Sequence, residues 1–399
     1  MKLKSTPEDF QVVEQIALQP TGGSFALYTL TKQSLGTPEA LAAVERRWGL
    51  ARGQIAFAGL KDRHALTRQY VTIERGPKRE LKQTSFELKY VGQTDRTVHA
   101  SDITANRFVV VLRDLSPEDA FEATSAIKQI EQDGLPNYFD DQRFGSLGES
   151  GEFIGKPWCL GDYERAVWLA IADANVHDRP DTRQQKGILR KHWGDWKECQ
   201  RILDDSPHSN VINFLAGNPR DFRRAITLLP QNMRSLYLAA FQSDLWNGVL
   251  SALVKQICRD EQIVPRTIAR REVALFQDLD KSQRSQLTAR LVPLPSARLH
   301  LEEGPLRTSI DEVLKAEGME LRQVRVKYPR DSFFSKGDRP AVFRPTALSH
   351  QGEEDDLFPQ RGKLTLQFDL PRGSYATILV KRIAGKAFDV DDDESLAGG

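Results

Sequence analysis

The sequence is poor in cysteine, and its arrangement of cysteine and histidine excludes two kinds of site. The three cysteines are widely spaced and form no Cys-x-x-Cys pair; they are Cys159, Cys199 and Cys258. This pattern indicates neither a disulfide framework nor a zinc site. Three histidines in the middle of the chain also lack the spacing of metal ligands; they are His177, His192 and His208. We therefore expect no bound metal.

The chain also lacks long apolar runs. No stretch reaches the roughly 18 apolar residues of a membrane-spanning helix. The stretch Met1–Pro7 has no apolar core of the kind found in a signal peptide. We therefore expect no membrane span and a cytoplasmic location.

The net charge is only +1, so composition alone does not indicate a nucleic-acid-binding protein. Locally the balance differs: residues 61–82 carry seven Lys or Arg against three Asp or Glu, and residues 322–344 carry seven against two. Acidic clusters at Glu353–Asp356 and Asp391–Glu394 offset these cations. The basic segments can form one face that attracts phosphates, or they can be scattered surface charge.

The remaining composition is that of a globular protein. With 399 residues, of which 40% are hydrophobic and 28% charged, the chain has room for two or three domains. In the first third, short alternating runs predict strands, and two capped amphipathic patterns predict helices. The predicted strands cover 7–14, 24–30, 55–58, 86–91 and 107–112. Thr37 is the predicted N-cap of the first helix, which ends at Gly49, and Ser116 starts the second, whose predicted inward face is Phe121, Thr124, Ile127 and Ile130. This mixture indicates an α+β fold.

The middle of the chain differs in composition from both ends. Glycines between Ser146 and Lys156 indicate a domain crossing, and helix-forming residues follow to about residue 269. Gln231–Arg259 is apolar almost all round, which predicts a central buried helix. Near Tyr328–Pro329 the composition changes again and becomes similar to that of the first third of the chain. We therefore divide the chain into 1–150, an inserted domain at 151–329, and 330–399, which ends in the acidic tail.

One loop has a composition that suggests a site. In Phe57–Gln69 a strand-like run ends at a glycine, and Lys61, Asp62, Arg63 and His64 follow in consecutive positions. A carboxylate between cations at the end of a strand can be kept ionised and aimed. The alternative is a solvent-exposed, charged connection, although turns are usually built from Gly, Asn, Asp or Pro.

A second segment, Leu135–Gly145, interleaves three aromatic residues with amides and an arginine. Aromatic faces stack on unpaired bases, and amides read base edges. The same residues could instead form a partly buried loop whose aromatic side chains fill the core.

Taken together, four collinear motifs resemble those of the TruD family of tRNA pseudouridine synthases. The resemblance rests on Lys4 with Pro7–Glu14, on Ala58–Gln69, on Pro136–Gly145 and on Leu370–Thr377. In the last motif, Tyr375 replaces the phenylalanine of the family. The resemblance implies a catalytic domain with a curved mixed sheet, interrupted by the family's own inserted α/β domain.

The resemblance also implies residue roles. By motif matching, Asp62 is the essential aspartate, and Phe10, Asn137 and Tyr375 contact the target nucleotide. Lys4 and Lys61 are expected charge partners of the aspartate or of phosphates. No cofactor and no metal are implied.

The implied activity is the isomerisation of uridine to pseudouridine in tRNA, with uridine 13 of the D-arm as the expected target. The partner is tRNA; no obligatory protein partner is expected, and the chain is expected to be a monomer. One alternative is a catalytically silent RNA-binding protein on the same scaffold. Another is a sugar-processing hydrolase, which needs a second acid such as Asp140 or Asp141 near Asp62.

Overall fold

A computed structural model describes residues 1–203 and 206–385 of the chain. The acidic tail at Asp391–Glu394 lies outside these residues. The chain forms two compact units: unit one comprises residues 1–135 together with the chain from 343 onward, and unit two comprises residues 136–342. Within the described ranges, no helix has both the length and the apolar character to cross a membrane.

The crossings between the units differ in position from the sequence-based boundaries at 150/151 and 329/330. Tyr138 donates a hydrogen bond from its hydroxyl to the carbonyl of Ala274, and Asn247 binds both the N–H and the C=O of Phe139. These contacts place Pro136–Gly145 inside unit two. At the other crossing, the strand Asp338–Pro340 pairs with Leu291–Pro293 of the same unit.

Unit one is built on a ten-stranded sheet with the order β15-β16-β8-β2-β5-β3-β7-β6, with β1 added to β8 and β4 to β5. The strands are β1 (Lys2–Leu3), β2 (Phe10–Ile16), β3 (Phe25–Gln33), β4 (Ile55–Phe57), β5 (Leu66–Glu74), β6 (Leu81–Lys82), β7 (Phe86–Thr94), β8 (Ile103–Leu115), β15 (Thr346–Glu354) and β16 (Gly362–Leu370). Its helices are α1 (Thr37–Trp48), α2 (Pro117–Asp133) and α12 (Ala376–Ile383). The predicted α+β class with a mixed sheet is confirmed.

The pairing of β2 with β5 is parallel, whereas the other strand pairs of this sheet are antiparallel. Gln11 lies opposite Leu66, so both strands begin at the same end of the sheet. Parallel strands place the segments that precede them side by side. The segment before β2 therefore meets the loop before β5.

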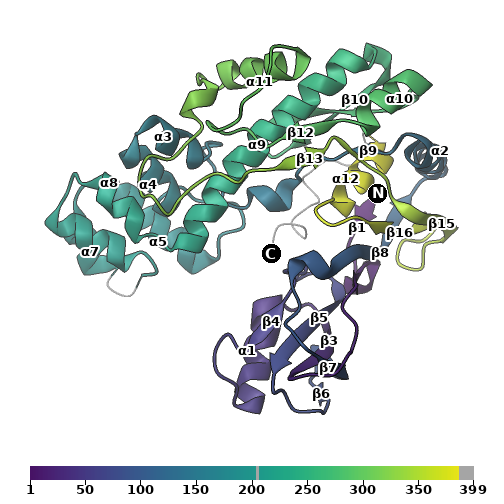
Figure 1. Cartoon of the computed structure of the whole chain (residues 1–399), viewed down its shortest axis with the longest axis horizontal. Helices are drawn as coiled ribbons and strands as arrows, with labels where there is room; N and C mark the ends of the chain where they lie inside the picture. The colour runs from purple at the N-terminus through teal and green to yellow at the C-terminus, as the bar shows by residue number, and fades with distance from the viewer. Residues whose placement is uncertain (204–205, 386–399) are drawn as a thin grey trace. The chain divides into compact units, whose positions relative to one another are not determined.

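The helix α1 packs over β3, β5 and β7 and closes an apolar core (Figure 1). The buried residues of this core include Tyr28, Leu41 and Val71. The helix ends at Gly49, whose φ of 66° is the left-handed conformation that glycine adopts most readily. The sequence predicted Thr37 as the N-cap; this was wrong by one residue. Gly36 is the N-cap, and the Thr37 hydroxyl instead donates a hydrogen bond to the side chain of Gln69.

The helix α2 begins as predicted, because the Ser116 hydroxyl accepts a hydrogen bond from the N–H of Asp119 at 3.0 Å. The inward face was predicted incorrectly at one position. Phe121 is 76% exposed, whereas Ala123, Ile127 and Ile130 are buried. The helix turns its small and β-branched residues inward and leaves the aromatic ring at the surface.

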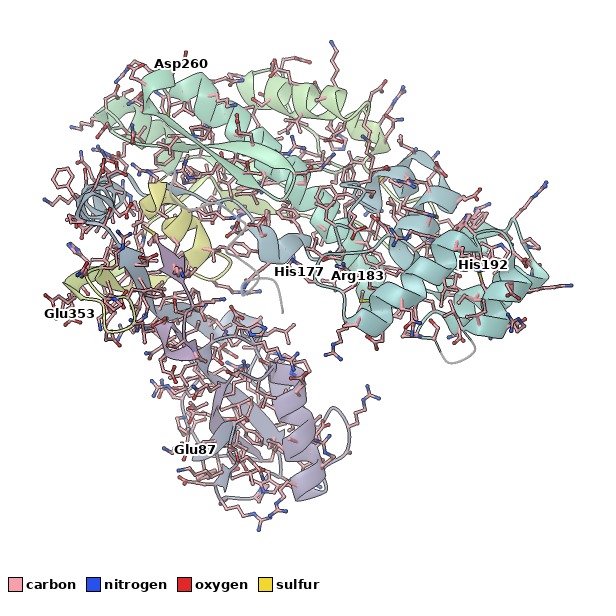
Figure 2. All side chains as sticks on the ribbon, turned by 180° about the vertical axis from the view of Figure 1, so that it is seen from behind. Glu87, His177, Arg183, His192, Asp260 and Glu353 are labelled. Atoms are coloured by element: carbon pink, nitrogen blue, oxygen red, sulfur yellow. The ribbon has the colours of Figure 1, made fainter. Side chains whose placement is uncertain are left out.

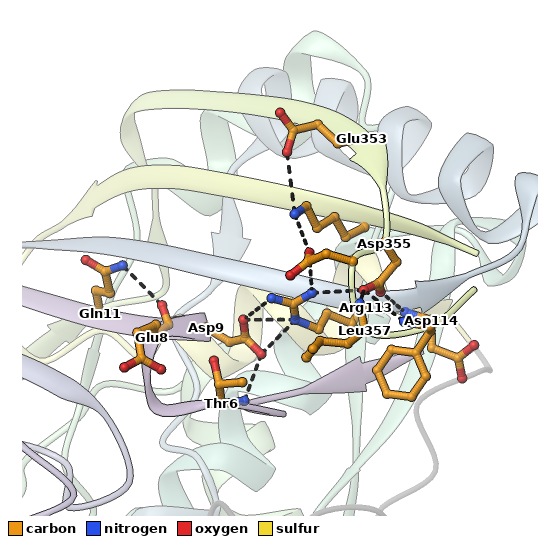
Figure 3. A network of polar contacts seen from close by, with 12 residues as sticks. Thr6, Glu8, Asp9, Gln11, Arg113, Asp114, Glu353, Asp355 and Leu357 are labelled. Atoms are coloured by element: carbon orange, nitrogen blue, oxygen red, sulfur yellow. Dashed lines mark hydrogen bonds and ion pairs between the residues drawn. The ribbon is translucent and has the colours of Figure 1, made fainter. Parts of the chain in front are cut away.

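A buried arginine ties together segments of unit one that are far apart in the sequence (Figure 3). Arg113 on β8 binds the carboxylate of Asp9 through its Nε at 3.0 Å and that of Asp355 through Nη1 at 2.9 Å. Asp9 ends the 3₁₀ turn Pro7–Asp9 directly before Phe10. The network therefore fixes the start of β2 against β8.

Unit two is mainly helical around a long central helix, α9 (Gln231–Ile257). Its other helices are α3 (Gly155–Leu160), α4 (Tyr163–Ile171), α5 (Pro180–Lys191), α6 (Trp196–Ile202), α7 (Ser209–Gly217), α8 (Phe222–Ala225), α10 (Lys281–Thr288) and α11 (Pro305–Ala316), and its short strands include β10 (Ile263–Ile268), β11 (Arg271–Phe276), β12 (Leu291–Pro293) and β13 (Asp338–Pro340). As the sequence indicated, most of α9 is buried, with Phe241, Leu245 and Trp246 fully enclosed. Two very short strands at the crossings are β9 (Leu135–Pro136) and β14 (Val342–Phe343).

The histidines of unit two do not converge. His177 and His192 flank α5 at its two ends (Figure 2). A helix of this length separates them by about 18 Å at 1.5 Å per residue. Over residues 1–203 and 206–385, no group of three or more His, Cys, Asp or Glu residues is arranged to hold a metal ion.

Candidate active site

Asp62 lies in the loop between β4 and β5, and its carboxylate is held from two sides. Oδ2 is 2.6 Å from the ammonium of Lys4, and Oδ1 accepts a hydrogen bond from the N–H of His64 at 3.1 Å. The side chains of Lys4 and Asp62 are only 1% and 9% exposed. Two opposite charges that are both withdrawn from water attract strongly, and each offsets the cost of burying the other.

The backbone conformation of Lys4 allows its side chain to reach Asp62. Lys4 lies between β1 and the turn that precedes β2, with a φ of 56°. This left-handed conformation is unfavourable for a residue with a Cβ and is usually maintained only by its surroundings. The Lys4 ammonium also lies 4.5 Å from the centre of the Phe10 ring. The segment before β2 thus places a cation against both Asp62 and Phe10.

Lys61 was expected to pair with Asp62 or with phosphates, and its ion-pair partner within the chain is Glu14. Its ammonium lies 2.6 Å from Oε2 of Glu14 on β2, rather than forming an ion pair with Asp62. The Glu14 side chain is fully buried, and its Oε1 accepts the N–H of Tyr70 at 3.1 Å. Of the two lysines, Lys4 is therefore the ion-pair partner of Asp62, and Lys61 ties the loop to the sheet.

The backbone of the loop is fixed by side chains from α1 and β5. The Thr37 hydroxyl accepts the N–H of Lys61 at 3.1 Å and donates to the amide oxygen of Gln69 at 2.8 Å. The Gln69 amide nitrogen donates to the carbonyl of Gly59 at 3.0 Å. This chain of hydrogen bonds fixes the backbone of the loop against α1 and β5.

Lys32 on β3 completes the support. Its ammonium donates to the carbonyl of Asp62 at 2.6 Å and to that of Lys61 at 3.3 Å. The side chain is fully buried. Burial lowers the pKa of Lys32 to about 8, although the charge of Asp62 opposes the shift.

The residues expected to contact a nucleotide lie in both units. Phe10 is 5% exposed and packs edge-on against Phe108, with ring centres 6.1 Å apart. Tyr375 is half-buried and precedes the first residue of α12. The strand before it, β16, ends at Leu370 opposite Asn106, which in turn lies opposite Glu14.

Asn137 is in unit two and is buried. Its amide oxygen accepts a hydrogen bond from Nη2 of Arg339 at 2.7 Å, and its amide nitrogen donates to the carbonyl of Pro340 at 3.1 Å. The aromatic residues around it, Tyr138, Phe139 and Phe144, are buried as well. This geometry matches the alternative in which the aromatic side chains of the segment fill the core.

Besides Oε2 of Glu14, which is ion-paired with Lys61, two buried oxygens on the same face of the sheet make no hydrogen bond within the described part of the chain. They are Oγ1 of Thr67 and Oδ1 of Asn106. Thr67 lies opposite Lys32, and Asn106 lies opposite Glu14. Buried polar atoms without a hydrogen bond are uncommon in folded proteins, and these two flank the residues that support Asp62.

The sequence matches the family described as tRNA pseudouridine synthase D (TruD) over residues 1–383. The chain belongs to the TruD family. It is similar to a protein of Methanocaldococcus jannaschii named "Probable tRNA pseudouridine synthase D 2", with 29% identity over 96% of this chain and 91% of that protein. A protein of Methanopyrus kandleri named "Probable tRNA pseudouridine synthase D" is 30% identical over 96% of this chain and 92% of its own length.

The fold is also that of a TruD protein. A crystal structure titled "Putative tRNA pseudouridine synthase D (TruD) from Methanosarcina mazei" superposes with a TM-score of 0.73 at 24% identity, and the match covers 96% of this chain and 93% of that one. TruD proteins are isomerases that act on RNA.

The sequence did not reveal all the residues that shape the loop of this TruD protein. Glu14 and Gln69 lay within the matched motifs, but their contacts could not be predicted from them. Lys32 was missed because the strand was predicted to end at Leu30. The sequence did carry a signal for Lys32: Ala26, Tyr28 and Leu30 are buried at every second position of β3, and Lys32 follows with the same period of two.

Proposed function

We propose that this TruD protein is a tRNA pseudouridine synthase that converts uridine 13 of the D-arm, with Asp62 as the catalytic residue. The observation that carries the proposal is the buried ion pair of Asp62 with Lys4 in the loop that bears the family motif. The names of the relatives support tRNA as the substrate. We propose that the enzyme acts in the cytoplasm.

The reaction rearranges bonds within one nucleotide. The N1–C1′ glycosidic bond breaks, the base turns, and a C5–C1′ bond forms; C5 loses a proton and N1 gains one. The carboxylate of Asp62 can serve as a nucleophile at the sugar or the base, or it can remove a ribose proton. Either role requires an ionised, oriented carboxylate, and the bonds from Lys4 and from the N–H of His64 provide both.

A uridine in folded tRNA must leave its stack to reach Asp62. We propose that Phe10 and Tyr375 receive the flipped base, since each base–aromatic stack is worth about 1–3 kcal/mol. Phe10 is now covered by the Lys4 ammonium and by Phe108, so the base would compete with these contacts. Tyr375 adds a hydroxyl, which can donate a hydrogen bond to the base.

Asn137 has a less direct role in this proposal. Because its amide is engaged with Arg339 and Pro340, we propose that it contacts the nucleotide only through the segment that it shapes. Unit two, at 136–342, would be the inserted domain of the family and would help to select the RNA.

The test is Asp62→Asn, which removes the charge and keeps the shape. We expect no pseudouridine in unmodified tRNA incubated with the variant, while tRNA binding remains measurable. The matched control is Asp102→Asn. It also breaks a 2.6 Å ion pair in unit one, between Asp102 and Arg96, and it should leave the rate per folded molecule unchanged.

Chemical mapping of pseudouridine along the tRNA gives both the rate and the position. Conversion by Asp62→Asn at the rate of the unaltered protein would refute the catalytic assignment. Conversion at a uridine other than uridine 13 would refute only the proposed target position. Binding of tRNA without conversion by the unaltered protein would favour the silent RNA-binding alternative.

A further inference from the structure

Lys32 is a buried cation of the site, and the proposed chemistry assigns no role to it. Its ammonium contacts two backbone carbonyls, those of Lys61 and Asp62. Among the described residues no carboxylate lies within ion-pair distance of it, whereas Lys4 and Lys61 each have one. A buried lysine with only neutral partners costs free energy. A purely structural strand position could hold an apolar residue instead.

The two carbonyls identify what the lysine acts on. They belong to the two peptide groups on either side of the Cα of Asp62, and both accept a hydrogen bond from the same ammonium. The side chains of these same two residues are held by Glu14 and Lys4. Lys32 thus fixes the backbone on both sides of the Asp62 Cα, and this sets the direction in which the Asp62 side chain projects.

We propose that Lys32 is a positioning residue of the pseudouridine synthase reaction, which orients Asp62 by holding the carbonyls of Lys61 and Asp62. This inference rests on the proposed function. It predicts that the protonated ammonium is needed, because hydrogen bonds from a charged donor are about twice as strong as those from a neutral one.

The charges around Lys32 determine its protonation. Asp62 and Glu39 favour the charged form, Lys61 and Arg63 disfavour it, and burial disfavours it most. The pKa of Lys32 is therefore about 8. Its strand neighbours Thr67 and Phe86 add no charge. As the pH rises through this value, the ammonium becomes a neutral amine and its hold on the loop weakens.

The experiment compares Lys32→Met, Lys32→Arg and the control Lys89→Met with the unaltered protein. Lys89 lies on the neighbouring strand β7, with its side chain 55% exposed. Release of tritium from the base carbon that becomes bonded to the ribose measures the rate on tRNA. At neutral pH we expect Lys32→Met to lower kcat about 100-fold, the effect of a small misplacement of a catalytic group. KM should change little.

The pH profile separates positioning from a general loss of structure. In the unaltered protein and in Lys89→Met, kcat should fall as the pH rises above about 8. In Lys32→Arg this fall should be absent, because arginine stays protonated in proteins. A fall at the same pH in Lys32→Arg would come from another group and would overturn the proposal. So would an unchanged kcat in folded Lys32→Met.

Trypsin provides a readout that does not require activity. Lys61 and Arg63 are cleavage sites within the loop, so a loosened loop should be cut faster in Lys32→Met than in Lys89→Met. Equal cleavage rates would refute the role in holding the loop. If Lys32→Met does not fold, the pH profile of the unaltered protein decides, since a flat profile above pH 8 overturns the proposal. If that protein makes no pseudouridine, the proposed function fails, and the cleavage test still applies.

Discussion

At the scale of single residues, the site depends on one strained backbone position. Lys4 adopts a φ of 56°, a conformation that costs about 1–3 kcal/mol for a residue other than glycine. The cost is offset by the contacts that this conformation allows, with Asp62 at 2.6 Å and with the Phe10 ring. A cation that touches both the carboxylate and the proposed stacking ring couples the two parts of the site.

Asn137 gives a prediction at the same scale. Asn137→Ala removes hydrogen bonds to Arg339 and Pro340 inside unit two. We expect the free energy of unfolding to fall by about 1–3 kcal/mol, the usual cost of disrupting buried hydrogen bonds. Urea denaturation measures it, and Asn213→Ala, which removes an exposed hydrogen bond to Gln200, is the control. Unchanged stability with slower catalysis would instead support direct contact with the nucleotide.

At the scale of elements, the Arg113 network holds the start of β2 in place. Arg113→Met leaves Asp9 and Asp355 buried without this cation. Breaking a buried ion pair in this way typically costs about 3–5 kcal/mol, so we expect a clear drop in the thermal midpoint. The comparison variant is Arg361→Met, whose pair with Asp114 is about one-third exposed on both sides.

Exposed ion pairs contribute about 0–1 kcal/mol, and the midpoint of Arg361→Met should therefore change little. Equal effects of the two substitutions would contradict the role of the network. If Arg113→Met is folded at the assay temperature, its rate should also fall, because Asp9 directly precedes Phe10.

The elements also show what the sequence could and could not predict. Caps fixed the ends of α1 and α2 to within a residue, because Gly49 and Ser116 act locally. The ion pair of Lys4 with Asp62 depends on the parallel pairing of β2 with β5. Period-two patterns identify strands but do not tell which strands are neighbours, nor in which direction. Lys61 was therefore expected near Asp62, while its actual partner Glu14 lies on another strand.

At the scale of the whole molecule, unit two is one continuous segment, residues 136–342. We expect this segment to fold alone, since it has its own core around α9. The control is the segment 151–329, which lacks Tyr138, Phe139 and the strand β13. Circular dichroism and thermal unfolding should show a cooperative transition for the first segment and a weaker one, at lower temperature, for the second. Equal stability of both segments would place the boundaries nearer to the sequence-based ones.

The position of unit two within the chain has a consequence for how the molecule folds. Strands β8 and β16 are neighbours, with Arg107 opposite Asp369, yet all of unit two lies between them in the sequence. Joining them would close a very long loop, at an entropic cost that grows with its length. At the base of unit two, the N–H of Asn137 donates to the carbonyl of Ala341 at 2.8 Å. Once unit two has folded, the ends of that loop are already together, so folding of unit two shortens the search by which β16, and Tyr375 after it, joins the sheet.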